Sequence, residues 1–561
     1  MSVANALYYG DNLEVLREKL ADESVDLIYL DPPFNSKRDY NLLFKSPKGA
    51  KSEAQITAFK DSWYWGEQAE REFDELLHQP NTEVAKLMQT FRGFLDQSDI
   101  MAYLTMMANR LLELHRVLKP TGSLYLHCDP TASHYLKIVL DSVFGPERFL
   151  NEIAWKRSSS HSGAKRWGPI HDTIFYYGRS DETMWNPTYQ EYDRAYITKF
   201  YSHRDASGQY QIDNLTGAGT RKGESGQPWR GVNPTLKGRH WAVPNALLRG
   251  LIDVDAEVTT QQKLDALDTA GLIYWPAKGG MPRLKRYLRA DGGVAIQDVI
   301  TDIDPISAHA QERLGYPTQK PLALLERIIS ASSNEGDVVL DPFCGCGTAV
   351  HAAHKLKRKW IGIDITHLAI SLIEKRLKDA FHTKCQFSVH GTPKDLEGAR
   401  DLAARDKYQF QYWAVSLVDA FPSQNKKKGA DGGIDGLKFF YDVKDVDARK
   451  IVIGVKGGKL KADDIRALNH VRDREMADIA LLISLDEPTA KMKADAASTG
   501  FYDWQSGKKQ SPRVQLLTIE GLLSGTQRAE HPDYVPDVNF KKARREKPKD
   551  GKGLFDAEHA P

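Results

Sequence analysis

Cysteine is scarce in this chain, because its 561 residues include only four: Cys128, Cys344, Cys346 and Cys385. Four cysteines cannot form a disulfide framework for a protein of this size, which indicates a reducing compartment. Long apolar runs are also missing, since no stretch approaches the roughly 20 residues of a membrane span. The N-terminus has no charged segment followed by an apolar one, so we expect no signal peptide. These absences predict a cytoplasmic protein without a membrane partner.

A large excess of either charge is absent as well. Lysine and arginine number 77 against 75 aspartates and glutamates, which leaves a formal net charge of +2. Net charge therefore does not identify a nucleic-acid-binding protein, and any basic surface has to be local. Hydrophobic residues make up 41% of the chain and charged residues 27%, as in ordinary globular proteins. The chain is too long for one core, so we expect about two to four domains.

Apolar runs with the composition of buried strands occur at 25–31 (VDLIYLD), 122–129 (GSLYLHCD) and 337–343 (DVVLDPF). A helical pattern, 101–120, separates the first two runs and ends at Pro120. The third run continues into a glycine-rich turn, a helical pattern and a further strand, KWIGIDI. This strand–helix–strand succession predicts an α/β fold with a parallel, Rossmann-like sheet.

Changes in composition and periodicity divide the chain further. Residues 156–315 are rich in Gly, Pro, Arg, Trp and Tyr and have weak periodicity, which predicts an inserted domain between two halves of the sheet, 1–155 and 316–395. After a charged helical linker, 405–525 carries a second, smaller α/β pattern. The remaining stretch, 526–561, contains KKARREKPKDGKG and predicts a disordered basic tail.

The stretch VVLDPFCGCGTAV predicts a ligand loop. Asp341 ends a strand, and Gly345 and Gly347 follow it in a tight turn before a helix, at the edge where open α/β sheets bind ligands. Asp364 ends the next strand at the spacing from which an acid can receive two ribose hydroxyls. No third glycine and no phosphate-binding Lys-Ser/Thr pair follows, so a nucleoside without phosphates fits best. Zinc is not expected at Cys344, Cys346, His351 and His354, because their spacing is wrong for a finger.

The tetrapeptide Asp31-Pro32-Pro33-Phe34 ends the first strand and therefore belongs at the same edge of the sheet. Two prolines remove backbone donors and most of the local freedom. Strand termination alone would explain the prolines, but the acid and the aromatic ring beside a nucleoside loop favour a catalytic role.

Three motifs, DPPF, LDPFCGCGT and YPTQKP, together resemble those of S-adenosylmethionine-dependent DNA amino-methyltransferases. The catalytic motif precedes the recognition insert and the cofactor motif, an order similar to that of the permuted β group of this family. The resemblance covers roughly residues 5–380 outside the insert. It implies double-stranded DNA as substrate, S-adenosylmethionine as cofactor, and a place in a restriction-modification system with a restriction subunit as a partner. It also suggests a homodimer.

The resemblance implies a role for each residue of DPPF. The Asp31 carboxylate and the Pro32 carbonyl would each accept one N–H of the target amine, while Pro33 holds the turn. The base has to leave the duplex to react, and Phe34 would stack on it. DPPF resembles the adenine-N6 version of the motif, and cytosine-N4 methylation is the alternative.

The same resemblance assigns the cofactor to residues of several segments. Asp364 would hold the ribose, Asp11 would lie near the adenine, and Thr318 and Lys320 would contact the methionine carboxylate. A solvated lysine before a helix is the plain alternative for Lys320. The full set that the resemblance implies is Asp11, Thr318, Lys320, Asp341, Phe343, Gly345, Gly347, Thr348 and Asp364.

Basic residues of the insert predict contacts with DNA phosphates and base edges. One group has no acid within it and is flanked by Trp155 and Trp167, and a second lies near Lys237 and Trp241. Solvated loop charges are the alternative for any single member. The candidates are Lys156, Arg157, Lys165, Arg166 and Arg239.

The C-terminal pattern resembles Mrr-type restriction-endonuclease-like domains. Asp435 stands at the start of one strand and Lys456 in the next, as in sites where carboxylates bind a metal that activates water. Gly454 replaces the Asp, Glu or Gln of that pattern, and the preceding helix offers Gln411 instead of an acid. These departures favour a DNA-binding or degenerate nuclease module, and magnesium would be needed only if the domain cleaves DNA.

Other hypotheses remain open at this point. One chain could both methylate and cut DNA, or a vestigial methylase fold could bind DNA without catalysis. Methylation of RNA or protein is a weaker alternative, because protein-glutamine enzymes resemble Asn-Pro-Pro-Tyr instead.

Overall fold

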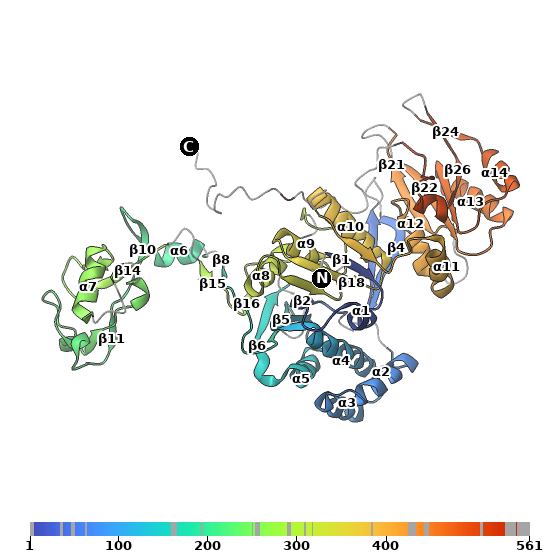
Figure 1. Ribbon diagram of the computed structural model, residues 1–561. Coiled ribbons are helices and arrows are strands. Elements are labelled where there is room, and N and C mark those ends of the chain that lie inside the picture. Colours follow the sequence, from blue (N-terminus) through green and yellow to red (C-terminus); the bar gives the residue numbers. More distant parts are fainter. Residues whose placement is uncertain are drawn as a thin grey trace. The chain divides into compact units, whose positions relative to one another are not determined.

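The computed structural model divides into two compact units, one comprising Met1–Asn186 and Gln297–Lys547 and the other Pro187–Ile296 (Figure 1). Each unit is described by itself. The described residues are 5–33, 38–45, 51–61, 64–158, 165, 167–190, 192, 194–248, 251–252, 258–288, 293–307, 310–316, 318–382, 385–423, 433–442, 448–504, 509–532 and 546. Among them, no helix is long and apolar enough to cross a membrane.

In the described part of the first unit, nine strands form one sheet. In spatial order they are β16 (Val299–Ile300), β6 (Phe149–Lys156), β7 (His171–Gly178), β5 (Leu118–Cys128), β2 (Val25–Leu30), β17 (Val338–Asp341), β18 (Lys359–Asp364), β1 (Ala6–Tyr9) and β19 (Ser388–His390). Neighbours from β5 to β19 run parallel, whereas β7 is antiparallel to both β5 and β6. The predicted α/β fold with a largely parallel sheet is confirmed.

Helices cover both faces of this sheet, which explains why its strands are apolar throughout. Ile28 and Leu30 of β2 pack with one helical layer, and Leu27 and Tyr29 pack with the other. The first layer consists of α1 (Asn12–Lys19), α2 (Glu67–Leu77), α3 (Thr82–Leu95), α4 (Asp99–Val117) and α5 (Ser133–Phe144). The second layer consists of α8 (Leu322–Ser332), α9 (Thr348–Lys355) and α10 (His367–Phe381).

The helix predicted at 101–120 is α4, which ends at Val117 because β5 begins at the next residue. Between β2 and α2, β3 (Arg38–Lys45) and β4 (Lys51–Asp61) pair as an antiparallel ribbon. A 3-10 turn, Pro146–Arg148, connects α5 to β6.

The predicted insert, 156–315, is too long at both ends. Residues 171–178 and 299–300 form β7 and β16 of the nine-stranded sheet. In β7, Ile174 and Tyr176 pack on one face of the sheet while Phe175 and Tyr177 pack on the other. A strand buried on both faces shows no alternation of apolar and polar residues, so its weak periodicity resembles that of an irregular segment. The separate unit is Pro187–Ile296.

This second unit is built from short strands around buried tryptophans. Trp229 and Trp241 pack edge to face with their ring centroids 5.9 Å apart, and Leu264, Leu267 and Leu284 complete the core. Its strands are β8 (Tyr189–Gln190), β9 (His203–Asp205), β10 (Gly208–Asn214), β11 (Thr216–Ala218), β12 (Arg239–Trp241), β13 (Ile273–Tyr274), β14 (Arg283–Tyr287) and β15 (Val294–Ala295). Its helices are α6 (Arg194–Phe200) and α7 (Thr260–Thr269), with 3-10 turns at Glu224–Gly226, Thr235–Lys237 and Asn245–Leu247.

The C-terminal part of the first unit forms a second sheet. In order, its described strands are β20 (Phe421–Pro422), β21 (Gly436–Phe440), β22 (Arg449–Lys456), β23 (Ile479–Ser484) and β26 (Val514–Thr518). Helices α11 (Leu396–Arg405) and α12 (Lys407–Ser416) pack on one face, and α13 (Ala462–Arg474) and α14 (Ala490–Ala497) pack on the other. The remaining elements are α15 (Ile519–Leu523) and the paired β24 (Phe501–Asp503) and β25 (Gln510–Pro512). Most of the predicted basic tail, 526–561, lies outside the described residues.

Candidate active site

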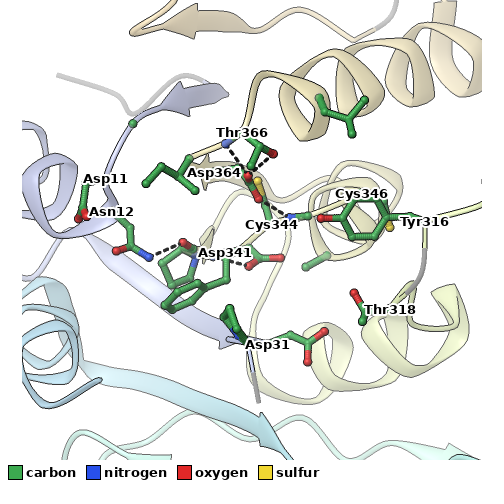
Figure 2. Close-up of a pocket in the computed structure, with 18 of the residues that line it drawn as sticks. Asp11, Asn12, Asp31, Tyr316, Thr318, Asp341, Cys344, Cys346, Asp364 and Thr366 are labelled. Atoms are coloured by element: carbon green, nitrogen blue, oxygen red, sulfur yellow. Dashed lines mark hydrogen bonds between the residues drawn. The ribbon is translucent and has the colours of Figure 1, made fainter. Parts of the chain in front are cut away.

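Four acids meet at the carboxyl edge of the large sheet. The neighbouring parallel strands β2, β17, β18 and β1 end here, and each supplies an acid at its end or within two residues of it. The acids line a single cavity of about 540 Å³ (Figure 2). They are Asp31, Asp341, Asp364 and Asp11. The two motifs that the sequence placed at one edge are therefore brought together.

The carboxylate of Asp364 joins two loops of the cavity. Its Oδ2 accepts a hydrogen bond from the backbone N–H of Gly345 at 2.9 Å, and its Oδ1 accepts from the N–H and hydroxyl of Thr366 at 2.9 and 2.8 Å (Figure 2). Burial raises the pKa of Asp364 to about 6, although these hydrogen bonds oppose the shift. Each oxygen has two lone pairs, and both of those on Oδ1 are used, so Oδ2 can accept one further hydrogen bond from a ligand.

Gly345 and Gly347 shape the loop by their backbone angles. Their φ values are +49° and +72°, in the left-handed region that favours glycine. A Cβ atom at Gly345 would lie 3.3 Å from Cε1 of Tyr316, and one at Gly347 would lie 2.7 Å from Cγ1 of Ile373. The loop therefore approaches Tyr316 and Ile373 more closely than any other residue type would allow.

The cavity carries more acid than base. Its four acids face only Arg110 and Lys320 among the lining residues. Burial raises the pKa of Asp341 well above its usual range, a hydrogen bond from the backbone N–H of Phe343 opposes this, and the charges of Asp31 and Asp364 add to it. A ligand that carries a positive charge would relieve this repulsion.

Asp31 has one oxygen engaged and one open. Lys320 donates from Nζ to Oδ2 in an ion pair, and both side chains are largely buried. Oδ1 is also buried, yet it has no hydrogen-bond partner among the residues that the structure describes. Buried polar atoms normally have partners, so an open carboxylate oxygen in a cavity indicates a place for a ligand donor. Pro32 is buried and Pro33 lines the cavity, whereas Phe34 lies outside the described residues.

Lys320 forms an ion pair that the sequence did not indicate. Its ammonium group neutralises Asp31, which lies 289 residues earlier in the chain. Thr318 lines the same cavity. Contact of these two residues with a methionine carboxylate stays a prediction.

Asn12 and Arg110 are cavity residues that the sequence analysis missed. Asn12 donates from Nδ2 to the carbonyl of Pro342 at 2.8 Å, and the buried Arg110 donates from Nε to Oδ1 of Asn12 at 2.5 Å. Arg110 also donates from Nη2 to both oxygens of Asp11 at 3.0 Å, while Asp11 caps α1. A lone arginine inside the apolar helical run MAYLTMMANRLLEL was the available signal.

The sequence pattern of the family described as DNA methylase matches residues 25–375. The chain belongs to this DNA methylase family.

Known methyltransferases and a Mod subunit are similar to this chain over part of their own length. The Type II methyltransferase M.EcaI of Enterobacter cloacae is 36% identical over 278 residues, which are 49% of this chain and 57% of that protein. The StyLTI Mod subunit of a Type III restriction-modification enzyme from Salmonella typhimurium is 27% identical over 372 residues, 63% of this chain and 50% of that protein. The Type II methyltransferase M.KpnI of Klebsiella pneumoniae is 23% identical over 374 residues, 63% of this chain and 77% of that protein. The chain thus spans little more than half of the first two relatives.

The helix that follows the glycine turn is tied into the protein by side-chain hydrogen bonds. Thr348 accepts at Oγ1 from Nη1 of the buried Arg376 at 3.1 Å. Arg376 also donates from Nε to Nδ1 of His351 at 3.2 Å, and Nε2 of His351 bonds to Glu546 at 3.1 Å. Burial lowers the pKa of His351 to about 4. Both of its ring nitrogens are therefore engaged, and the described residues contain no group of three side chains suited to a metal ion.

The predicted DNA-binding residues are divided between the two units. Lys156 ends β6 and Lys165 is exposed, and Trp167 beside them is 97% exposed, while Arg166 lies outside the described residues. Arg239 belongs to the second unit, where it donates to Thr216.

Arg157 is exposed, but it pairs with the first member of a buried polar chain. Its Nε lies 3.0 Å from Oδ1 of Asp172, whose Oδ2 bonds to Nε2 of His127 at 3.1 Å. Nδ1 of His127 in turn shares a 2.9 Å hydrogen bond with the hydroxyl of Tyr29, which lines the cavity. Arg157 is thus linked to the cavity through this chain of contacts, and its contact with DNA stays a prediction.

The two residues of the predicted nuclease motif have protein partners. Asp435 accepts at Oδ1 from Nε2 of Gln411 at 2.9 Å and at Oδ2 from the backbone N–H of Val455 at 2.6 Å. Lys456 pairs with Asp464 at 3.0 Å. A Cβ at Gly454 would point toward Leu468 and Leu482, so an apolar surface lies where the motif has a carboxylate or amide.

Gly347→Ala tests the close packing of the cofactor loop. Its positive φ and the short approach to Ile373 should together lower the free energy of unfolding by about 2–4 kcal/mol. Gly336→Ala is the matched control, because Gly336 has a φ of +90° and no atom within 4 Å of the added Cβ. It should lose about 1–2 kcal/mol from backbone strain alone. Denaturant unfolding measures both, and equal losses would contradict the packing role of Ile373.

Asp364→Asn tests the raised pKa of the loop carboxylate. A folded-state pKa of about 6 lies above that of the unfolded chain, so ionisation of Asp364 destabilises the fold as pH rises through this window. The wild type should lose about 1 kcal/mol relative to the variant between about pH 5 and pH 7.5. Parallel unfolding curves at both pH values would show it. An identical pH dependence in the two proteins would contradict the shift.

Proposed function

We propose that this protein is a site-specific DNA methyltransferase that transfers a methyl group from S-adenosylmethionine to adenine N6 in duplex DNA after base flipping. The observation that carries the proposal is the open, buried Oδ1 of Asp31 in the same cavity as the loop held by Asp364. The open oxygen of Asp31 suits an amine that donates a hydrogen bond, and the loop held by Asp364 suits a nucleoside.

The residues of the cavity fit the proposed cofactor. When bound, S-adenosylmethionine supplies an electrophilic methyl group on a positively charged sulfonium. The excess of acid in the cavity suits this charge, and Oδ2 of Asp364 can accept from a ribose hydroxyl. Gly345 and Gly347 have no side chains, so the backbone of the loop can pass close to Tyr316 and Ile373. Lys320 and Thr318 are the proposed contacts of the carboxylate end.

Asp31 and Pro32 orient the target amine in the proposed reaction. An exocyclic amine is a poor nucleophile because its lone pair is delocalised into the ring. Oδ1 of Asp31 accepts one N–H and the carbonyl of Pro32 accepts the other, which draws the nitrogen toward tetrahedral geometry. Lys320 fixes the rotamer of Asp31 through Oδ2. Alignment of reactants of this kind contributes several kcal/mol, up to roughly 7–11 kcal/mol in favourable intramolecular cases.

The motif DPPF supports adenine N6 over the alternative, cytosine N4. The order of the motifs along the chain supports a place in the permuted β group. Strand β2 with Asp31 precedes β17 and β18 by some 300 residues, although the three strands are neighbours in the sheet.

Double-stranded DNA is the proposed partner at this edge. Strand β6 runs in the same direction as β2, since β7 is antiparallel to β6 and to β5. The segment after Lys156, with Lys165 and the exposed Trp167, therefore leaves the sheet at the edge of Asp31. We assign target recognition to the unit 187–296. The relation to a Type III Mod subunit supports a restriction subunit as a further partner, and a homodimer follows from the family resemblance alone.

The test of this proposal is methylation of mixed genomic DNA by the purified full chain with labelled cofactor, followed by sequencing for modified bases. Methylated adenine within one short sequence is the expected result. Asp31→Ala should still bind the cofactor but lose at least about a hundredfold in rate, because it removes the acceptor that orients the amine. Methylated cytosine would overturn adenine specificity, and cofactor binding without transfer to any DNA base would overturn the function.

For the C-terminal sheet we propose a restriction-endonuclease-like module that does not cut. Asp435 is held by Gln411 and a backbone N–H, and Lys456 is paired with Asp464. We expect no cleavage of unmethylated DNA with magnesium ions, and Asp435→Ala should instead cost about 1–3 kcal/mol of stability. Nicking assays and unfolding curves measure the two effects. Magnesium-dependent cleavage that disappears in Asp435→Ala would contradict this assignment and favour a bifunctional methylase-endonuclease.

A further inference from the structure

Helix α12, from the C-terminal part of the chain, forms one wall of the cavity at the edge of the large sheet. Tyr408, Gln409 and Tyr412 line the cavity together with Asp364, although they follow the matched family segment, 25–375. Nothing in the family motifs predicts a contribution from this helix.

Contacts place α12 beside the Asp364 loop, at the end of the cavity where the nucleoside of the proposed cofactor would lie. The backbone N–H of His367, which starts α10 just after the Asp364 loop, donates to Oε1 of Gln409 at 3.5 Å. The ring of His367 stacks on Tyr9 of β1 with centroids 3.6 Å apart, and Tyr9 also packs against the core of the C-terminal sheet. In the order of the sheet, β18 and β1 lie on the far side of β17 from β2. Helix α12 is therefore at the end of the cavity away from Asp31.

The lining at this end is apolar and aromatic. Ile365, directly after Asp364, is 59% exposed and lines the cavity, as does Tyr408, which is also 59% exposed. Leu368 of α10 and Tyr412 line it as well. Exposed apolar and aromatic side chains next to a ribose-type acid suit the faces of a flat ring, which gain from burial and stacking.

The rest of α12 is firmly anchored, so these side chains are held in place. Asp406 caps the helix by accepting from the backbone N–H groups of Tyr408 and Gln409 at 2.9 and 3.0 Å. Phe410 and Trp413 are buried in the core of the C-terminal sheet, and Gln411 bonds to Asp435. Asp435 thus has a structural task in this chain: it fixes the helix that faces the cavity.

We propose that α12 belongs to the cofactor site, where Tyr408 and Tyr412 cover the purine of S-adenosylmethionine opposite Ile365. The C-terminal module is then a part of the methyltransferase that helps to bind its cofactor. The inference rests on the proposed function, since it names further binding residues for the same site.

Titration calorimetry on the full chain tests the proposal, with S-adenosylmethionine and S-adenosylhomocysteine as probes. Tyr408→Ala and Tyr412→Ala should each weaken binding of both probes about tenfold, the effect of losing a stacking contact. Tyr408→Phe keeps the ring and should bind as the wild type does. Phe501→Ala is the matched control, because Phe501 of β24 is a 51% exposed aromatic residue of the same C-terminal module that does not line the cavity.

The outcomes separate this inference from the proposed function. Wild-type binding with unchanged or tighter binding in Tyr408→Ala and Tyr412→Ala would overturn the role of α12 and leave the methyltransferase proposal standing. No affinity of the wild type for either probe would overturn the proposed function and this inference with it. Unfolding curves of all variants ensure that binding is compared between folded proteins, and the exposure of Tyr408 makes its removal tolerable to the fold.

Discussion

The hydrogen bonds of the Asp364 carboxylate are the interaction on which the site depends. They tie the loop after β17, through Gly345, to the loop after β18, through Thr366. They add to the backbone hydrogen bond from Cys344 to Ile363, which joins the same loop to β18 at 3.1 Å. The carboxylate is buried for this purpose, and its raised pKa is the cost of that burial. The remaining lone pair of Oδ2 can accept a hydrogen bond from a ribose hydroxyl of the proposed cofactor.

The two ends of the cavity on either side of these hydrogen bonds have different linings. At one end, Asp31 keeps an open oxygen while Lys320 holds the other, which suits the orientation of an amine. At the other end, Ile365 and the tyrosines of α12 present apolar and aromatic surface. Asp341 lies between them on β17, within the repulsion of its acidic neighbours. The gradient from charged to aromatic lining matches a ligand with a cationic centre and a flat ring.

Much of this arrangement could be predicted from short segments of sequence. The strands 25–31, 337–343 and 359–365 were identified because a doubly covered parallel strand is a continuous apolar run. Asp31, Asp341 and Asp364 could be placed together because parallel strands share one carboxyl edge. The boundaries of the insert were wrong because β7 is buried on both faces and shows no alternation of apolar and polar residues, while β16 is very short. The ion pair of Arg157, a predicted DNA contact, could not be predicted because its partner, Asp172, lies across a strand pair.

The sequence by itself determined the strand ends, the glycine turn and the acids that follow them, because these depend on residues close together in the chain. Only the tertiary structure decided that Lys320 pairs with Asp31, that Arg110 and Asn12 support the loop at Pro342, and that α12 reaches the cavity. The hydrogen bonds of Lys320, Asn12 and Arg110 join residues 289, 330 and 98 positions apart, and they exist only once the layers have packed. No local pattern encodes which distant side chain will fill the space beside a buried carboxylate.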